Sequence, residues 1–173
     1  IEAMNGHIMT KSTDKTLTIE RNHIKPMKSI KFEAGENTGS TDSDVANNEI
    51  RYTAYAKVEA FPTYHWIFET FGANIVAHEW DATTGEGVIT FDNDVQQLDY
   101  CAFYWCDSLI SITIPDSVVM IGTGVFQYCI NLTSITIPDS VETIGNSAFC
   151  DCDSLTSVNI PDSVVWIGDD AFC

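Results

Sequence analysis

The sequence predicts a solenoid, a stack of short coils that share a parallel β-sheet and are joined by turns or 3-10 segments. The first observation is a 23-residue repeat, marked by prolines at 115, 138 and 161 and by a leucine, a glycine and a phenylalanine in each copy. The second is the alternation of apolar and polar residues before each proline, which is typical of a half-buried strand. Because one such coil cannot bury its apolar face alone, neighbouring coils have to stack.

The boundaries of the coils follow from this period. Complete coils are expected at 106–128, 129–151 and 152–173. The segment 87–105 is expected to form a degenerate first coil, because it lacks the cysteine, leucine and proline of the repeat. It keeps the apolar positions, which are Ile89, Phe91, Val95, Leu98 and Phe103. The predicted repeat region therefore spans 87–173.

Each complete coil is predicted to begin with a strand, which reads S-I-T-I-P in the first two copies and S-V-N-I-P in the third. In the first copy, Ile112 and Ile114 are expected to point into the core, and Ser111 and Thr113 to point outward. Pro115 ends the strand because it has no amide hydrogen for a ladder.

The rest of the coil is expected to turn back toward the core. Asp116 and Ser117 carry side-chain oxygens that we expect to cap the free amides of a following turn. Val118 and Ile121 then re-enter the core, and Gly122 allows a sharp corner.

The repeat pattern C-x-x-L-x-S-I-x-I-P-D-S-V-x-x-I-G-x-x-A-F resembles the BspA-type leucine-rich-repeat family of bacterial surface proteins. Upstream, NEIRYTAY (48–55) and FGANIVAHEWDATTGEGVITF (71–91) resemble the segment that commonly precedes the first repeat. The resemblance implies a leucine-rich-repeat solenoid, wound as a right-handed superhelix, at an extracellular or outer cell-surface location. It also implies a role in adhesion or host-protein binding.

The N-terminal half is predicted to hold a small β region ahead of the repeats. In the unassigned segment 1–47, residues 16–20 and 28–34 read as short strands separated by a turn at 22–26, and 36–48 as a polar linker. In the capping segment 48–86, residues 49–60 read as a strand with Ile50, Tyr52, Ala54 and Ala56 on one face. The aromatic-rich stretch 61–71 is expected to cover the open end of the first coil, and a binding patch is the alternative.

Charge is distributed unevenly along the chain. All eight Lys and Arg residues lie at or before Lys57, whereas 17 acidic residues and no basic one lie between Val58 and Cys173. Such an acidic repeat region argues against nucleic acid or an anionic lipid surface as a partner. No apolar stretch approaches the roughly 18–20 residues that would cross a membrane, so no direct insertion is expected. Solubility is the favoured explanation of the charge, and attraction to basic partners or calcium is the alternative.

Two acidic sets are candidates for calcium ligands. Asp116, Asp139 and Asp162 recur at the same place in successive coils, and Asp92 and Asp94 flank an asparagine. A hard cation needs about 6–8 converging oxygens, so capping is favoured for the first set and a turn for the second. No metal or cofactor is predicted.

The six cysteines are predicted to be free thiols. Cys106, Cys129 and Cys152 recur at the repeat period, which makes them a buried column of small apolar side chains. Cys150 and Cys173 are also one period apart, but stacked parallel side chains are expected to make poor disulfide geometry. The C-x-C at 150–152 does not have the spacing of a zinc site.

No residues are expected to form a catalytic site. His78-Glu79 begins like a zinc-protease helix, but no second histidine follows at the required offset. There is no glycine-rich phosphate loop and no G-x-S-x-G elbow. The chain is therefore predicted not to be an enzyme.

Outward-facing strand residues are the predicted contact surface for a partner, because the strand face is the usual contact surface of the family that the chain resembles. Short polar side chains also suit any exposed strand, so a purely structural role is the alternative. A rival surface is the column Met120, Thr143 and Trp166, where a tryptophan could anchor a partner. The predicted contact residues are Ser111, Ser134 and Ser157 in one column and Thr113, Thr136 and Asn159 in the other.

The predicted function is that of an adhesin-like binding module, secreted or at the cell surface, for a host or bacterial protein or glycan. The alternative is a non-catalytic spacer or accessory domain of a larger surface protein. The chain begins with Ile rather than Met and stops at Cys173, just before a further coil would start. We therefore expect a signal or lipid anchor that was removed or lies outside this sequence. We also expect either a truncated chain or end-to-end self-association through the last coil.

Overall fold

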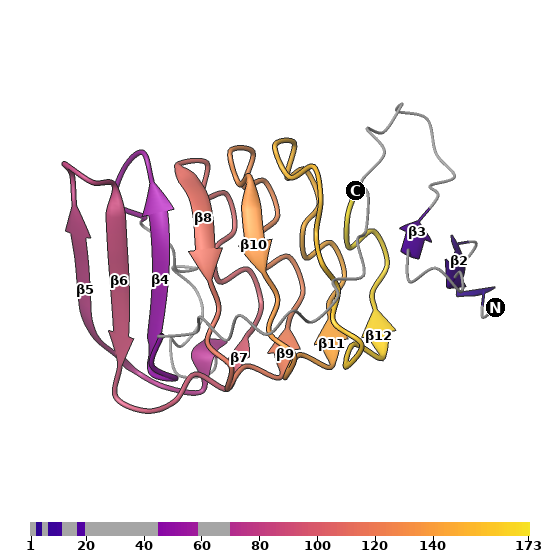
Figure 1. The fold of residues 1–173 in the computed structure, drawn as a ribbon, viewed down its shortest axis with the longest axis horizontal. Coiled ribbons are helices and arrows are strands. Elements are labelled where there is room, and N and C mark those ends of the chain that lie inside the picture. The colour runs from indigo at the N-terminus through magenta and orange to yellow at the C-terminus, as the bar shows by residue number, and fades with distance from the viewer. Residues whose placement is uncertain (1–2, 5–6, 12–16, 20–44, 59–69) are drawn as a thin grey trace.

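The computed structural model describes residues 3–4, 7–11, 17–19, 45–58 and 70–173, and within these ranges the chain forms strands in three sheets (Figure 1). A small antiparallel sheet contains β1 (Ala3–Met4), β2 (His7–Lys11) and β3 (Leu17–Ile19). β3 falls within the strand predicted at 16–20, and β2 was not predicted. The predicted strand at 28–34, the turn at 22–26, most of the linker at 36–48 and the aromatic residues of 61–69 lie outside the described residues.

The largest sheet is mixed and has the strand order β10-β8-β4-β6-β5. β8 (Leu109–Thr113) and β10 (Ser134–Thr136) come from the first two complete repeats and pair in parallel. β4 (Glu49–Ala54), β6 (Glu86–Phe91) and β5 (Ile75–Asp81) continue the sheet with antiparallel pairs. The sheet therefore changes from antiparallel to parallel where the complete repeats begin.

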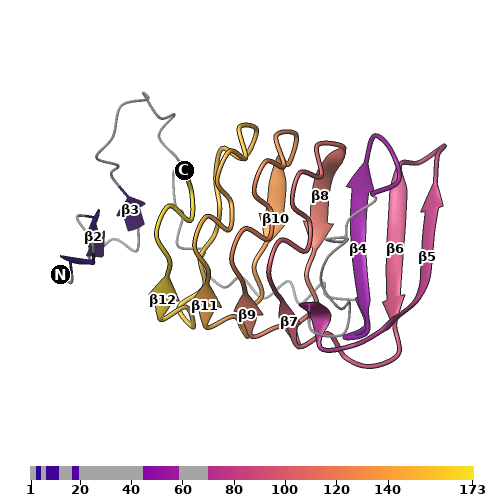
Figure 2. The same ribbon diagram turned by 180° about the vertical axis from the view of Figure 1, so that it is seen from behind.

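A second sheet runs along the repeats and is parallel throughout. It contains β7 (Gln97–Leu98), β9 (Met120–Ile121), β11 (Thr143–Ile144) and β12 (Trp166–Ile167), in sequence order. Figures 1 and 2 show these short strands side by side along one edge of the stack. Each of the first two complete repeats thus contributes one strand to each of two sheets, as a coil requires.

Turns form the third wall of each coil and are joined by backbone hydrogen bonds one repeat apart. The N–H of Phe103 donates to the carbonyl oxygen of Val125 at 2.8 Å, and the N–H of Phe126 donates to that of Ala148 at 2.8 Å. These bonds satisfy backbone groups that would otherwise be buried without a partner.

A column of phenylalanine rings fills the space inside the coils. Phe103, Phe126, Phe149 and Phe172 lie with successive ring centroids 5.4, 5.3 and 5.1 Å apart and with nearly parallel planes. Phe71 extends the column at the other end, with its ring 6.2 Å from that of Phe103. The inward positions predicted from the repeat are also buried: Ile112, Ile114, Val118 and Ile121.

In the segment predicted as a degenerate first coil, 87–105, it is the second half whose strand pairs with a complete repeat. β6, which forms its first half, does not lie beside β8, because β4 is inserted between them. β7, in its second half, does pair in parallel with β9. The first half of this segment therefore does not form a coil whose strand pairs with β8, which corrects the prediction for β6.

β4 buries one face, as its alternation predicts. Ile50, Tyr52 and Ala54 are buried, but Ala56 is exposed and lies beyond the end of the strand, so its predicted inward position is wrong. The register between β4 and β8 shifts between Thr53 and Ala54, where regular pairing ends.

The repeated glycines permit a close approach of neighbouring backbones. A Cβ atom on Gly145 would lie only 2.4 Å from the carbonyl carbon of Gly122 and 2.6 Å from the nitrogen of Thr123. A sharp corner in the backbone was the predicted reason for Gly122. Gly122 and Gly145 do not have positive φ, so conformational freedom does not explain why glycine is needed there. Lack of a side chain, rather than backbone freedom, is what the position requires.

The serine two residues after each repeat proline forms a hydrogen bond to the preceding coil. The hydroxyl of Ser140 donates to the carbonyl oxygen of Val118 at 2.6 Å, and that of Ser163 donates to Val141 at 2.8 Å. Ser117 makes the same bond to Val95 at 2.7 Å. These hydroxyls act as donors between coils, which differs from the predicted capping of amides.

None of the helical segments in the described part of the chain has the length and apolar character needed to cross a membrane.

Candidate functional site

The candidate site is the outer face of the mixed sheet, where the predicted contact residues lie. Ser111 pairs in register with Ser134, and Thr113 with Thr136. An isolated parallel bridge then joins Thr136 to Asn159 of the third repeat. The side chains of Ser134, Thr136, Ser157 and Asn159 are exposed, and those of Ser111 and Thr113 are half-buried.

β4 continues this face beyond the repeats, which the sequence analysis did not predict. Thr53 lies opposite Ser111, and their hydroxyl oxygens are 2.7 Å apart. Arg51 lies opposite Thr113 and forms an ion pair with Glu49, with Nη2 and Oε2 2.9 Å apart. The alternation in NEIRYTAY was the available signal, but nothing in the repeat period indicates which strand β4 joins.

At its far edge the face becomes acidic. Across the strands, Thr53 lies opposite Glu86 on β6, and Glu86 lies opposite Asp81 on β5. Two residues further along each strand, Arg51 lies opposite Val88, and Val88 lies opposite Glu79. A partner lying along the sheet would therefore meet small hydroxyl and amide groups over the repeats and carboxylates at the antiparallel edge.

The rival surface lies on the second sheet. Met120, Thr143 and Trp166 pair in register along it, as the repeat predicts. Trp166 is 39% exposed, and the neighbouring Val165 is 80% exposed. This surface is more apolar than the strand face of the mixed sheet.

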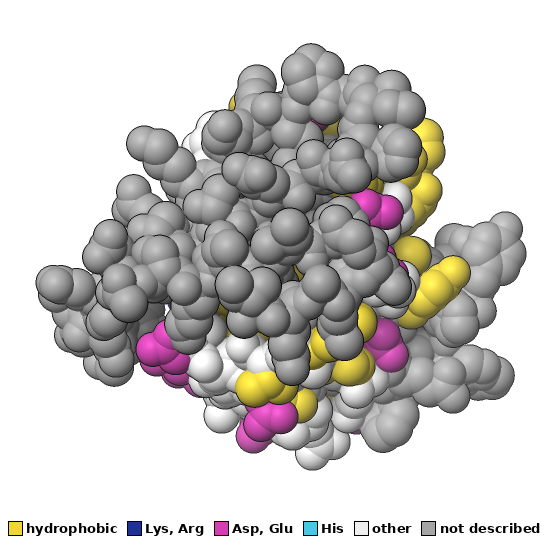
Figure 3. All heavy atoms as spheres, turned by 90° about the vertical axis from the view of Figure 1, so that its right-hand side faces the viewer, with side chains coloured by type: hydrophobic (Ala, Val, Ile, Leu, Met, Phe, Trp, Pro, Cys, Tyr) yellow, Lys and Arg dark blue, Asp and Glu magenta, His cyan; other side chains and the backbone are white. Residues whose placement is uncertain are grey.

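Basic side chains are scarce on the described surface. Arg51 is paired with Glu49, and Lys57 donates from Nζ to the carbonyl oxygen of His78 at 3.1 Å. Figure 3 looks at the side of the molecule that faces right in Figure 1, and the described side chains visible there include acidic and hydrophobic ones, with none coloured as Lys or Arg. The described side chains in this view therefore agree with the absence of Lys and Arg from 58–173.

The cysteine column is buried and has free thiols, as predicted for Cys106, Cys129 and Cys152. Cys129 donates from Sγ to the carbonyl oxygen of Phe103 at 3.1 Å, and Cys152 makes the equivalent bond to Phe126 at 3.1 Å. The pKa of Cys129 is raised by its hydrogen bond with Cys106 and by burial, and burial raises the pKa of Cys152. Both therefore stay protonated and lack the thiolate that a nucleophile needs.

The prediction that all six thiols are free is wrong, because Cys150 and Cys173 form a disulfide. Their Cα atoms are 4.2 Å apart, closer than the roughly 4.8 Å spacing of stacked strands. The turns approach one another more closely than the argument from parallel stacking assumed, and this brings the two sulfurs within bonding reach.

The described residues contain one group of side chains close enough together to hold a metal ion. It consists of Cys150, Asp151 and Cys173, whose candidate ligand atoms lie within 4.8 Å of one another. Both sulfurs are used in the disulfide and are not thiolate ligands in this form.

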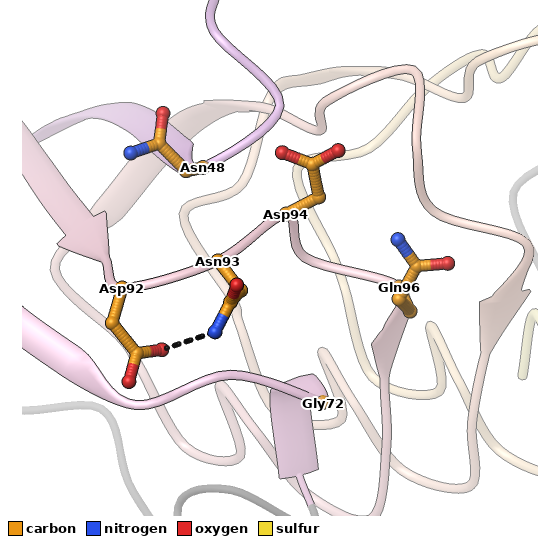
Figure 4. Close-up of a pocket in the computed structure, with 6 residues that line it drawn as sticks. All are labelled: Asn48, Gly72, Asp92, Asn93, Asp94 and Gln96. Carbon is orange, nitrogen blue, oxygen red and sulfur yellow. Dashed lines mark hydrogen bonds between the residues drawn. The ribbon is translucent and has the colours of Figure 1, made fainter.

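The Asp92–Asp94 turn lines a shallow polar hollow together with Asn48, Gly72 and Gln96 (Figure 4). Asp92 accepts hydrogen bonds from the backbone N–H of Asn74 at 2.8 Å and from its side-chain amide at 2.9 Å. Asn93 donates a third at 3.4 Å. These bonds, the side-chain bond of Asn74 first, lower the pKa of Asp92. They support the predicted role in a turn.

His78 lies on strand β5 rather than on a helix, which removes the geometry of a zinc protease. Its Nε2 is 2.7 Å from the hydroxyl oxygen of Tyr52. Burial raises the pKa of Tyr52, so its hydroxyl stays protonated and can share a hydrogen bond with the histidine. The pair joins β4 to β5.

A family model described as "BspA type Leucine rich repeat region" matches residues 84–173 in six copies. Among solved structures, a leucine-rich repeat protein of T. pallidum (TpLRR) is similar at 28% identity and a TM-score of 0.47, over 66% of this chain and 56% of that one. A leucine-rich repeat protein from Bacteroides ovatus ATCC 8483 is similar at 29% identity and a TM-score of 0.46, over 75% of this chain and 32% of that one. No curated protein matches the chain.

The chain thus spans about half or less of the length of these two structural relatives. Leucine-rich repeats of this type are typically non-catalytic scaffolds for protein interactions, in proteins that are typically surface-located or secreted. Because the match covers more than half of its residues, this chain belongs to the BspA-type leucine-rich-repeat family.

Proposed function

We propose that this protein is an adhesin-like binding module, located outside the cell or on its surface, that presents the strand face of its mixed sheet to a protein or glycan partner. The observation that carries the proposal is the register of Ser111 with Ser134 and of Thr113 with Thr136 and Asn159. This register forms two adjacent columns of short polar side chains. One contains Ser111 and Ser134, with Ser157 at the equivalent position of the third repeat, and the other contains Thr113, Thr136 and Asn159.

The physical argument for this face is its regular spacing and the small entropy cost of ordering its side chains. Serine, threonine and asparagine have short side chains, so they lose little conformational entropy when a partner binds them. They also donate and accept hydrogen bonds, so they suit both the backbone of an extended peptide and the hydroxyls of a sugar. Thr53 on β4 extends the serine column by one strand.

The antiparallel strands β4, β6 and β5 serve in this proposal as the cap of the first repeat. Repeat stacks need a terminal unit that covers the apolar end and remains soluble. Ile50, Ile89 and Phe91 are buried on the inner face of these strands. The outer face carries Glu79, Asp81 and Glu86, which keep the end of the sheet hydrated.

A matched pair of threonines tests the proposed face. The chain is first screened against immobilised matrix proteins and glycans. Thr136→Arg and Thr143→Arg then add the same charge to the same repeat, the first on the mixed sheet and the second on the other sheet. We expect Thr136→Arg to weaken binding at least about tenfold, and Thr143→Arg to leave it unchanged. The melting temperatures should stay close, because surface substitutions typically cost within about 0.5 kcal/mol.

Two outcomes oppose the proposal. Binding that survives Thr136→Arg and is lost on Trp166→Ala assigns contact to the second sheet. A chain that binds no member of the panel favours the spacer or accessory domain.

A further inference from the structure

Three aromatic side chains gather on the outside of the turns, away from the buried phenylalanine column. The rings of Trp105 and Tyr128 have centroids 5.4 Å apart, and those of Tyr104 and Tyr128 are 5.6 Å apart. The ring centroids of Tyr104 and Trp105 are 6.2 Å apart, and the ring planes are inclined by 68°. Trp105 is 65% exposed and Tyr104 40% exposed, so these rings present faces and edges to solvent.

The backbone at two of these residues is in the left-handed region. Trp105 has φ 59° and Tyr128 has φ 63°, and Asp151, at the same place in the next repeat, has φ 58°. Hydrogen bonds between turns hold this geometry: the N–H of Trp105 donates to Gln127 at 2.9 Å, and that of Tyr128 donates to Cys150 at 3.0 Å. Asn, Asp and Gly suit such a position, whereas a bulky side chain there is an outlier.

Trp105 and Tyr128 therefore work against local backbone preference, and neither belongs to the buried core. Strain of this kind is often found at binding sites. An Asp or Asn at 105 or 128 would satisfy the turn at lower cost, as Asp151 does one repeat later. The exposure of Trp105 excludes a major role in burying apolar surface.

Among the described residues, the charged side chains next to the cluster in the sequence or in the repeat register are acidic. Asp107 is exposed, and its N–H donates to the carbonyl oxygen of Trp105 at 3.0 Å. Asp151 follows Tyr128 in the same column of turns. No Lys or Arg occurs between residues 58 and 173, so the repeats themselves supply no cation to the rings.

We propose that Tyr104, Trp105 and Tyr128 form a docking site for a Lys- or Arg-bearing segment of a partner protein. The face of an aromatic ring attracts a cation through its quadrupole, and tryptophan does so best. Asp107 and Asp151 add carboxylates with which the same ammonium or guanidinium group can pair. Acidic partners are repelled, and a neutral sugar gains nothing from the charge. The site lies on the turns, so it does not depend on the strand face proposed above.

The test uses substitutions that remove a ring and suit the backbone. Trp105→Asn and Tyr128→Asn each place a residue that accepts the left-handed region, so folding should be retained or improved. Neither changes the net charge. Trp166→Ala is the matched control, because it removes an exposed tryptophan from the second sheet, again without a change of charge.

Binding of fluorescein-labelled hexa-arginine to the whole chain is measured by anisotropy at low salt, with maltohexaose as a competitor. We expect the double variant Trp105→Asn/Tyr128→Asn to bind the peptide about tenfold more weakly than the unmodified chain, and Trp166→Ala to bind it equally well. Maltohexaose should not displace it.

Equal affinity of the double variant and the unmodified chain would overturn the site, since attraction would then come from net charge alone. Displacement by maltohexaose would assign the rings to sugars instead. Both outcomes leave the test of Thr136→Arg on the strand face unaffected.

Discussion

The repeats at 106–173 and the antiparallel strands at 45–58 and 70–91 are held together in different ways. In the repeats, most buried side chains pack against their own copies one period away, as Phe126 does with Phe103 and Phe149. In the antiparallel strands the partners are unlike residues, such as Tyr52 with His78 and Asn74 with Asp92. The repeats are therefore stabilised by the same contacts made again in each coil. The antiparallel strands are stabilised by contacts that each occur once.

Phe126→Ala is expected to have the largest effect on stability. Its ring is stacked between two others inside the repeats, so truncation leaves a cavity that neither neighbour can fill, at a cost of about 4 kcal/mol. Urea unfolding measures this cost. Phe172→Ala, which removes a ring with one stacked neighbour, should cost less. If the two variants lose the same free energy of unfolding, the number of stacked neighbours does not determine how much each ring contributes to stability.

Gly145→Ala is expected to cost about 3 kcal/mol, because the added methyl group meets the backbone of Gly122 and Thr123. The matched control is Gly124→Ser, at a position where Ser147 stands one repeat later with φ 53°. That control should cost clearly less, about 1 kcal/mol, because the serine Cβ meets only side-chain atoms of Cys101 and Gln127 and the left-handed backbone disfavours serine modestly. If both variants unfold at the same urea concentration, the close approach of the backbones is not what selects glycine.

Loss of the disulfide is expected to cost about 2 kcal/mol, because the bond closes a loop between residues 23 apart. Dithiothreitol should lower the melting temperature of the unmodified chain but leave that of Cys150→Ser/Cys173→Ser unchanged. Thiol titration of the denatured, unreduced chain should count four thiols. A count of six would restore the original expectation from the sequence.

Asp92→Asn is expected to have the smallest effect, visible as a change in pH dependence. Hydrogen bonds from Asn74 hold the folded pKa of Asp92 below its ordinary value of 3.8. Because the unfolded chain takes up the proton first, this stabilisation is present above the ordinary pKa and is lost as the pH falls through the folded pKa.

The unmodified chain should therefore lose stability more steeply than Asp92→Asn between about pH 5 and pH 3, as measured by urea unfolding. Asn74→Ala removes the side-chain donor and should reduce the slope in the same way. Parallel slopes for all three proteins would mean that these bonds do not stabilise the charged form.

The 23-residue period was sufficient to predict the inward positions of the complete repeats, such as Ile112 and Val118, and the buried thiols of Cys129 and Cys152. It succeeded because residues one period apart meet in the structure, so the sequence itself identifies the neighbours. The register of Thr113 with Thr136, which is the basis of the candidate face, follows from the same rule.

The insertion of β4 beside β8 could not be predicted in this way. Thr53 and Ser111 are 58 residues apart and share no motif, and antiparallel pairing leaves no periodic signal in the sequence. The disulfide was missed for another reason: the period placed Cys150 near Cys173, but only coordinates give the 4.2 Å between their Cα atoms. The aromatic cluster was missed because Trp105 and Tyr128 are one period apart but differ in identity.

The change from antiparallel to parallel pairing at β8 bears on how such a chain can change length by gene duplication. A duplicated 23-residue unit placed after β8 finds the same phenylalanine, glycine and serine contacts on both sides, and lengthens the sheet by about 4.8 Å. A unit placed before β8 would have to replace β4, whose pairing with both β8 and β6 depends on antiparallel register. We therefore expect repeats to be gained or lost on the C-terminal side of this junction, and the antiparallel strands to be kept as one unit.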